Sequence, residues 1–162
     1  MPRHCLDANV FIEAKKGPYG MDIVPAFWDW LDQQVSAGII YSSTLVYDEL
    51  VAGNDELARW TRARKNSGLF EQPSAQVQQY FQAIANFAET QYPQHEAGKF
   101  LNSADPWIVA HAMNNHSIVV TYETLAPSSS QRIKIPNICQ HFGVSCMGPY
   151  QMLRQLGARF VL

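Results

Sequence analysis

The sequence predicts an α/β fold in which a central, mostly parallel β-sheet is flanked by α-helices. Strand-like and helix-like segments alternate along the chain, which is typical of parallel strands joined by right-handed crossovers. Residues 117–121 contain an uninterrupted apolar run, as expected for a strand covered on both faces. With 162 residues, 47% of them hydrophobic, the chain is long enough for one core, and we expect a single domain over residues 1–162.

Local patterns predict the order of the elements. Short apolar segments predict strands over residues 4–7, 39–42, 117–121, 132–135 and 158–162. Apolar positions at helical spacing, together with capping residues, predict helices over residues 25–35, 45–50, 55–65, 75–92, 104–113, 136–142 and 149–155. We find no internal repeat and no glycine-rich loop of the kind that cradles nucleotide phosphates.

The segment around Asp105 has the features of a helix start. Ser103 is the expected N-cap, and Pro106 lacks a backbone N–H and therefore belongs in a first turn. These two residues place Asp105 at the N-terminal end of a helix whose following residues are largely apolar. The carboxylate has two possible roles there: a favourable interaction with the helix dipole, or part of a functional site.

Three other acids occupy comparable positions at the ends of apolar segments. Asp7 ends the first strand, where it either caps a following helix or lies at the sheet edge that holds the sites of α/β proteins. Glu49 is expected on the apolar face of its helix, where burial is costly unless a cation or partner is present. Glu123 follows the strand over residues 117–121.

Because parallel strands end at one edge of the sheet, these four acids are expected to converge. Carboxylates that converge repel one another unless they share protons or bind a hard divalent cation, which prefers oxygen ligands. Such a cation can activate water and stabilise a phosphodiester during its hydrolysis. The acids therefore predict phosphoryl chemistry without a cysteine or histidine nucleophile.

Charge and composition restrict the partners. The net charge of −2 gives no global attraction to nucleic acid, so binding would need a local patch. The densest basic segment carries Arg62 and Lys65, which either contact a phosphate backbone or form a solvated helix face. Trp28, Trp30 and Trp60 cannot all be assigned to the core, which leaves a homo-oligomer as an expectation.

Cysteine usage and hydropathy predict a protein of the cytoplasm. Cys5, Cys139 and Cys146 are odd in number and widely spaced, which fits a reducing compartment. Cys139, His141 and Cys146 lack a fourth zinc ligand, so buried thiols are favoured. The first residues have no apolar signal stretch and no apolar run approaches about 20 residues, so we expect neither export nor membrane insertion.

Four motifs in order resemble the acidic motifs of PIN-domain ribonucleases. They are Leu-Asp-Ala-Asn-Val-Phe at 6–11, Ser-Thr-Leu-Val-Tyr-Asp-Glu-Leu at 43–50, Ala-Asp-Pro-Trp-Ile-Val-Ala-His-Ala at 104–112 and Val-Val-Thr-Tyr-Glu at 119–123. The resemblance covers nearly the whole chain and is greatest for a bacterial PIN-like family that shares the Lys-Ile-Pro stretch at 134–136. It implies a PIN-like fold.

The resemblance also implies roles for individual residues. The acidic core that would bind metal and carry catalysis is Asp7, Glu49, Asp105 and Glu123. Many relatives have aspartate in place of Glu123, so this longer side chain would bind metal either directly or through water.

Further roles come from the same resemblance. Asn9 and Thr121 match polar positions that orient the acids or their waters. Lys134 would contact the scissile phosphate or pair with an acid, although a lysine that protects an edge strand is an equal alternative.

The activity implied is that of an endoribonuclease that depends on Mg²⁺ or Mn²⁺. Many PIN proteins are toxins of toxin–antitoxin pairs, so an RNA substrate and a protein antitoxin are the expected partners. Two alternatives remain: a metal-dependent enzyme acting on DNA or small phosphate esters, and a PIN-like interaction module without catalysis.

Overall fold

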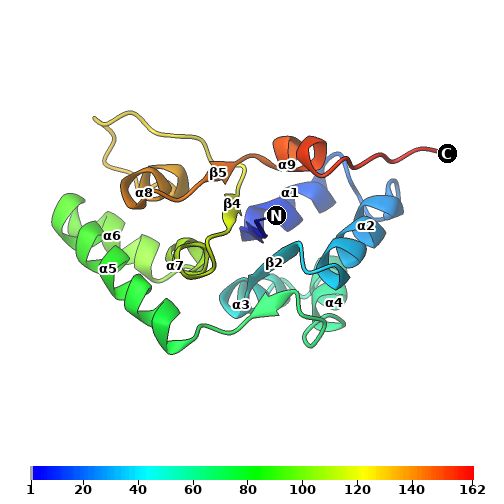
Figure 1. The fold of residues 1–162 in the computed structure, drawn as a ribbon, viewed down its shortest axis with the longest axis horizontal. Coiled ribbons are helices and arrows are strands. Elements are labelled where there is room, and N and C mark those ends of the chain that lie inside the picture. The colour runs from blue at the N-terminus through cyan, green and yellow to red at the C-terminus, as the bar shows by residue number, and fades with distance from the viewer. Residues whose placement is uncertain (1) are drawn as a thin grey trace.

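The computed structural model, which describes residues 2–162, has an α/β architecture with one all-parallel sheet (Figure 1). The strands of the described chain are β1 (His4–Leu6), β2 (Ile40–Ser43), β3 (Phe70–Glu71), β4 (Ile118–Val120) and β5 (Cys146–Met147). Their order across the sheet is β3-β2-β1-β4-β5. This architecture confirms the predicted fold class and is consistent with a PIN-like fold.

Helices cover the sheet on both sides. They are α1 (Ala8–Lys16), α2 (Pro25–Ser36), α3 (Thr44–Val51), α4 (Glu56–Arg62), α5 (Ala75–Gln91), α6 (Gln94–Leu101), α7 (Asp105–Asn115), α8 (Ile135–Phe142) and α9 (Pro149–Gln155). In Figure 1 the sheet lies between α5, α6, α7 and α8 on the left and α1, α2, α4 and α9 on the right. No helix in residues 2–162 has both the length and the apolar character needed to cross a membrane.

Two predicted strands are absent from the described chain. Residues 132–134 are irregular and lead directly into α8, where Asn137 hydrogen-bonds both the N–H and the carbonyl of Ala126. Residues 158–162 are not paired with the sheet. Instead, Phe160 packs against the rings of Tyr19, Phe27 and Trp30. Both segments thus have conformations that local sequence patterns did not predict.

Four elements were not among those predicted from the sequence. Helix α1 entered only as an alternative role of Asp7, as the cap of a following helix. Strands β3 and β5 have only two residues each, too few for any periodic pattern to show. Helix α6 lies between Pro93 and Asn102, where we expected only a connection to the helix of Asp105. Its buried residues, Ala97 and Phe100, are three apart, so it contributes a narrow apolar stripe to the core.

The tryptophans lie in an aromatic cluster within the chain. Trp28 is buried and meets Trp60 edge to face, with ring centroids 5.0 Å apart. Trp30 stacks on Phe27 at 6.4 Å. Each of the three indoles therefore has an intramolecular partner, and the homo-oligomer remains a prediction.

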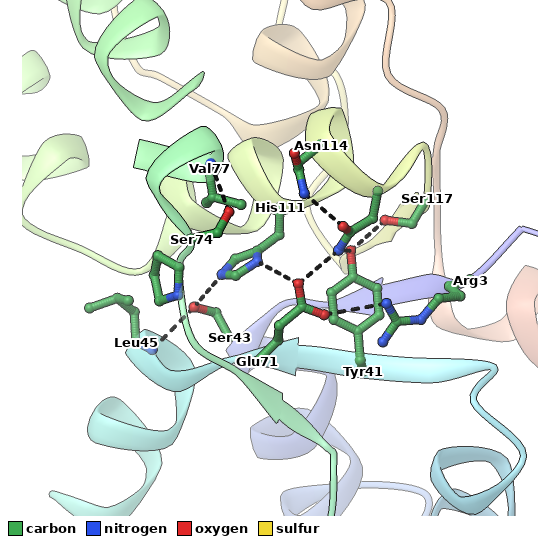
Figure 2. A network of polar contacts seen from close by, with 12 residues as sticks. Arg3, Tyr41, Ser43, Leu45, Glu71, Ser74, Val77, His111, Asn114 and Ser117 are labelled. Carbon is green, nitrogen blue, oxygen red and sulfur yellow. Dashed lines mark hydrogen bonds and ion pairs between the residues drawn. The ribbon is translucent and has the colours of Figure 1, made fainter. Parts of the chain in front are cut away.

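A polar network joins the sheet to α7 (Figure 2). The Tyr41 hydroxyl lies 2.6 Å from Ser117 Oγ and accepts a hydrogen bond from Asn115 Nδ2 at 3.0 Å. The same amide nitrogen donates to Glu71 Oε1 at 3.1 Å, and Glu71 Oε2 pairs with Arg3 at 3.3 Å. The network thus connects β2, β3 and α7 with the residues directly before β1 and β4.

His111 extends this network toward the start of α3. Its Nε2 lies 3.0 Å from Ser43 Oγ, which also caps α3 by accepting a hydrogen bond from the Leu45 N–H. Complete burial lowers the pKa of His111, although the nearby charge of Glu71 opposes this shift. A neutral His111 therefore holds α7 above the carboxyl end of β2.

We expect Tyr41→Phe to lower the free energy of unfolding by about 1–3 kcal/mol, because the buried Ser117 hydroxyl and the Asn115 amide lose a partner. Urea unfolding of the single variants Tyr41→Phe and Ser117→Ala and of the double variant measures the effect. Because the two hydroxyls bond each other, the double variant should cost less than the sum. Additive losses would contradict this coupling.

Candidate functional site

Four acids from four segments lie at the carboxyl edge of the sheet. Asp7 directly follows β1, Glu123 lies just beyond β4, Glu49 is in the helix that follows β2, and Asp105 is the first residue of α7. The register places Leu6 beside Val120, so the residues that follow these two strands leave the sheet side by side. The predicted convergence therefore has its basis in the parallel pairing of β1 and β4.

Asp7 combines the two roles that the sequence offered as alternatives, a helix cap and a residue of the sheet edge. It is the N-cap of α1, where its Oδ1 accepts a hydrogen bond from the Ala8 N–H at 2.7 Å, and it lies at the sheet edge. Its Oδ2 accepts from the Thr121 hydroxyl at 2.9 Å. Burial raises the pKa of Asp7, and the charge of Glu123 adds to this effect, whereas the two hydrogen bonds oppose it.

Thr121 and Asn9 connect the carboxyl ends of β1 and β4. The Thr121 hydroxyl donates to Asp7 and accepts from Asn9 Nδ2 at 3.1 Å and from the Glu123 N–H at 3.1 Å. Asn9 Oδ1 in turn accepts from the Tyr122 N–H at 3.2 Å. The hydroxyl thus uses its proton and both lone pairs, which fixes the rotamer that meets Asp7.

Glu49 reaches the site by a route that the sequence did not indicate. The prediction of a carboxylate on the buried face was wrong, because Glu49 is an exposed residue of α3. Its Oε1 accepts a hydrogen bond from the Ala104 N–H at 2.8 Å, directly before Asp105. A side chain from another helix therefore satisfies a backbone donor at the start of α7.

Ser103 also has a different position from the one predicted. Ala104 is the N-cap residue of α7, and Ser103 precedes it. The Ser103 hydroxyl accepts from the Asp105 N–H at 3.2 Å and donates to the Phe100 carbonyl at 2.7 Å. Ser103 therefore joins the end of α6 to the first residue of α7.

Glu123 forms a second contact of the same kind. Its Oε2 accepts from the Ile135 N–H at 2.9 Å, at the first residue of α8. Glu49 and Glu123 thus each use one oxygen at the start of a helix, where the positive end of the dipole stabilises a carboxylate.

Asp105 is the carboxylate with the least compensation. Within residues 2–162 no hydrogen-bond donor meets its side chain. Burial and then the charges of Asp7, Glu123 and Glu49 raise the pKa of Asp105 to about 8, against the opposing charge of Lys134. The three other acids therefore lie within electrostatic reach of Asp105.

The donor chemistry fits a hard divalent cation, although the ligands are not gathered around one point. Within residues 2–162 no three side chains of His, Cys, Asp or Glu form a group that could hold a metal ion as they stand. One carboxylate oxygen of Glu49 and one of Glu123 are already engaged by backbone N–H groups at helix starts. A set of four carboxylates without sulfur suits Mg²⁺ or Mn²⁺ better than zinc or copper.

Three hollows surround the acids. One of about 350 Å³ is lined by Asp105 and Lys134, one of about 370 Å³ by Asn9 and Glu123, and one of about 180 Å³ by Glu49. They leave space for a ligand on several sides of the carboxylates.

The other basic candidates lie elsewhere. Arg62 and Lys65 are not among the residues that line the three hollows. Instead, Arg62 donates to the Val51 carbonyl at 3.0 Å, and Lys65 Nζ lies 5.9 Å from the centre of the Tyr47 ring. The structure thus brings Lys134 to the hollow of Asp105, whereas Arg62 is the last residue of α4 and Lys65 lies in the turn that follows it.

The family of the chain follows from a comparison with family models. The model described as a domain of unknown function, DUF4411, matches residues 4–160. The chain belongs to this family. A comparison with curated proteins gives no match. The matched range contains all four acids and the two residues, Asn9 and Thr121, that hold Asp7.

Without divalent cations, we expect Asp105→Asn to become progressively more stable than the wild type as the pH rises from 5 to 8. The unfolded state loses the Asp105 proton near pH 3.8 and the folded state near pH 8, so the wild type loses stability across this interval. The difference in unfolding free energy should grow by on the order of 1 kcal/mol per pH unit. Urea unfolding in chelator at several pH values measures it.

Asp48→Asn is the matched control, because it removes an exposed carboxylate next to Glu49. Contributions from histidines are common to all three proteins and cancel in the comparison. Parallel pH profiles for the wild type and Asp105→Asn would show that Asp105 is not held protonated by its neighbours.

Proposed function

We propose that this protein is an endoribonuclease that hydrolyses RNA phosphodiester bonds with the help of Mg²⁺ or Mn²⁺. The observation that carries the proposal is the convergence of Asp7, Glu49, Asp105 and Glu123 from four elements onto one sheet edge. So much negative charge in one place destabilises the fold unless a cation neutralises it. The resemblance of the four motifs to PIN-domain ribonucleases supports the same reaction.

The four acids are the residues that would hold the cation. A bound divalent cation makes hydroxide available near neutral pH and offsets charge on the reacting phosphate. Asp105 has the free carboxylate for this role, and Asp7 is oriented for it by the Thr121 hydroxyl, which Asn9 supports in turn. Lys134 lines the hollow beside Asp105 and would contact a phosphate oxygen there.

We expect purified protein to cut single-stranded RNA in Mn²⁺ or Mg²⁺ but not in chelator. Asp7→Asn and Asp105→Asn should each lower the rate by at least about 100-fold, because each removes a cation ligand. Asp48→Asn should cut like the wild type. The assay uses labelled RNA, single-stranded DNA of the same sequence and a small phosphate diester, beside calorimetric titration with Mn²⁺.

The pattern of results decides between the candidate functions. Cutting of DNA or of the small diester in preference to RNA would replace the proposal with another metal-dependent phosphodiesterase. A folded protein that neither cuts nor binds Mn²⁺ would be an interaction module. Full activity of both aspartate variants would place the reaction elsewhere in the molecule.

We propose further that the protein is the toxin of a bacterial toxin–antitoxin pair, a role supported by the resemblance alone. Induced expression of the wild type in a bacterial host should then arrest growth. Asp105→Asn at an equal protein level should not, because this variant is expected to cleave RNA far more slowly. Colony counts and immunoblots measure this. Equal growth of the two strains would remove the toxin role and leave the nuclease proposal intact.

A further inference from the structure

The hollow beside Asp105 contains more positive charge than that of Lys134, which acts on Asp105. Three basic side chains line it: Lys99 from α6, and Arg132 and Lys134 from the irregular segment before α8. We call this space of about 350 Å³ the phosphate hollow. Asp105 and Glu96 are the acids in its wall.

The cations of this hollow are weakly compensated. Within residues 2–162 the Arg132 side chain forms no ion pair, and Lys99 has only a contact of 4.0 Å with Glu96. By contrast, Arg3, Lys15 and Arg64 each form an ion pair of 3.3 Å or less in the described chain. Other surface cations are also unpaired, but these share one concave space with an acid of the proposed site.

The backbone that carries these cations is fixed. Asn137 binds the preceding loop at Ala126, and Glu123 accepts from the Ile135 N–H at the other end of the segment. Arg132 and Lys134 therefore emerge from a segment held by one of the four acids. Lys99 comes from the other side, on a helix that packs against α7.

An aromatic hollow lies at Glu123, where the second space of about 370 Å³ is found. Tyr122 and Tyr150 line it with ring centroids 6.0 Å apart, and Tyr150 is 44% exposed. An exposed ring of this kind stacks with a base only when that base is unpaired. Because one acid of the proposed site lines each hollow, a single strand that crosses the site would present a base to the tyrosines and a phosphate to the cations.

We propose that the phosphate hollow binds a backbone phosphate of single-stranded RNA, next to the phosphate that is cleaved. The inference rests on the proposed function and names the part of the substrate that Lys99 and Arg132 recognise. The Arg132 guanidinium offers paired donors that match two phosphate oxygens, and Lys99 adds a mobile point charge. Lys134, which faces Asp105, would lie between the two phosphates.

Binding of RNA by the double variant Lys99→Gln/Arg132→Gln tests the proposal. Arg154→Gln/Arg159→Gln is the matched control, because it removes the same charge from exposed residues of α9 and the C-terminal segment. The probe is a fluorescent single-stranded RNA in chelator, followed by anisotropy at several salt concentrations. Both variants change exposed side chains and are expected to fold.

We expect the affinity of Lys99→Gln/Arg132→Gln for RNA to fall about tenfold, since a charge-assisted contact is lost. A plot of the logarithm of the RNA association constant against the logarithm of the salt concentration should become less steep. Its slope should decrease in magnitude by about 0.7, the value for one phosphate contact on a single strand. The control should keep its slope and lose less than about twofold. In cleavage with Mn²⁺ the KM should rise while kcat stays within about twofold, because the contact is equal in ground and transition states.

The outcomes separate this inference from the proposed function. Selective loss of RNA affinity without cutting by any protein would keep the phosphate hollow and remove the nuclease. Cutting by the wild type, with the double variant equal to the control in affinity and KM, would remove the phosphate hollow and keep the nuclease. Absence of RNA binding by the wild type would also overturn the inference. So would duplex RNA as a second probe, if the wild type bound it as tightly as the single strand and the double variant lost the same affinity for both.

Discussion

Mutual repulsion among four carboxylates at one sheet edge is the constraint on which the rest of this structure depends. The sheet brings them together because β1 and β4 are parallel neighbours, so Asp7 and Thr121 leave it side by side. Three of the acids are partly compensated by local donors: Asp7 by the Ala8 N–H and the Thr121 hydroxyl, Glu49 by the Ala104 N–H, and Glu123 by the Ile135 N–H. Asp105 has no such donor in the described chain, and burial, followed by the charges of the other three acids, raises its pKa.

The same contacts build the tertiary structure around the site. Glu49 ties α3 to the start of α7, and Glu123 ties the end of β4 to the start of α8. Replacement of either glutamate therefore affects helix packing as well as any ligand, whereas Asp105 can change with fewer structural consequences. Nearer the C-terminal end of α7, the network of Tyr41, His111 and Glu71 fixes the helix to the sheet. The position of Asp105 thus depends on polar contacts at several points along α7.

Charge is separated across the site. The chain has a net charge of −2, yet basic side chains line the phosphate hollow beside Asp105, and tyrosines line the hollow at Glu123. A strand of RNA carries both phosphates and bases, so it matches this arrangement better than a small diester would. A cation bound by the carboxylates would join the phosphate hollow and the tyrosine-lined hollow into one binding surface.

Local sequence determined the fold class, the ends of β1 and β4 and the order of the four acids along the chain, because these features depend on short-range patterns. The apolar run of β4, the capping side chains of Asp7, Ser43 and Ser74, and the start of α7 near Pro106 are all of this kind. Only the tertiary structure decided that Glu49 is exposed and caps a different helix, that residues 132–134 are irregular, and that Lys99 reaches the acids on an unpredicted helix. These features depend on contacts between residues distant in sequence, and no local periodicity records such contacts.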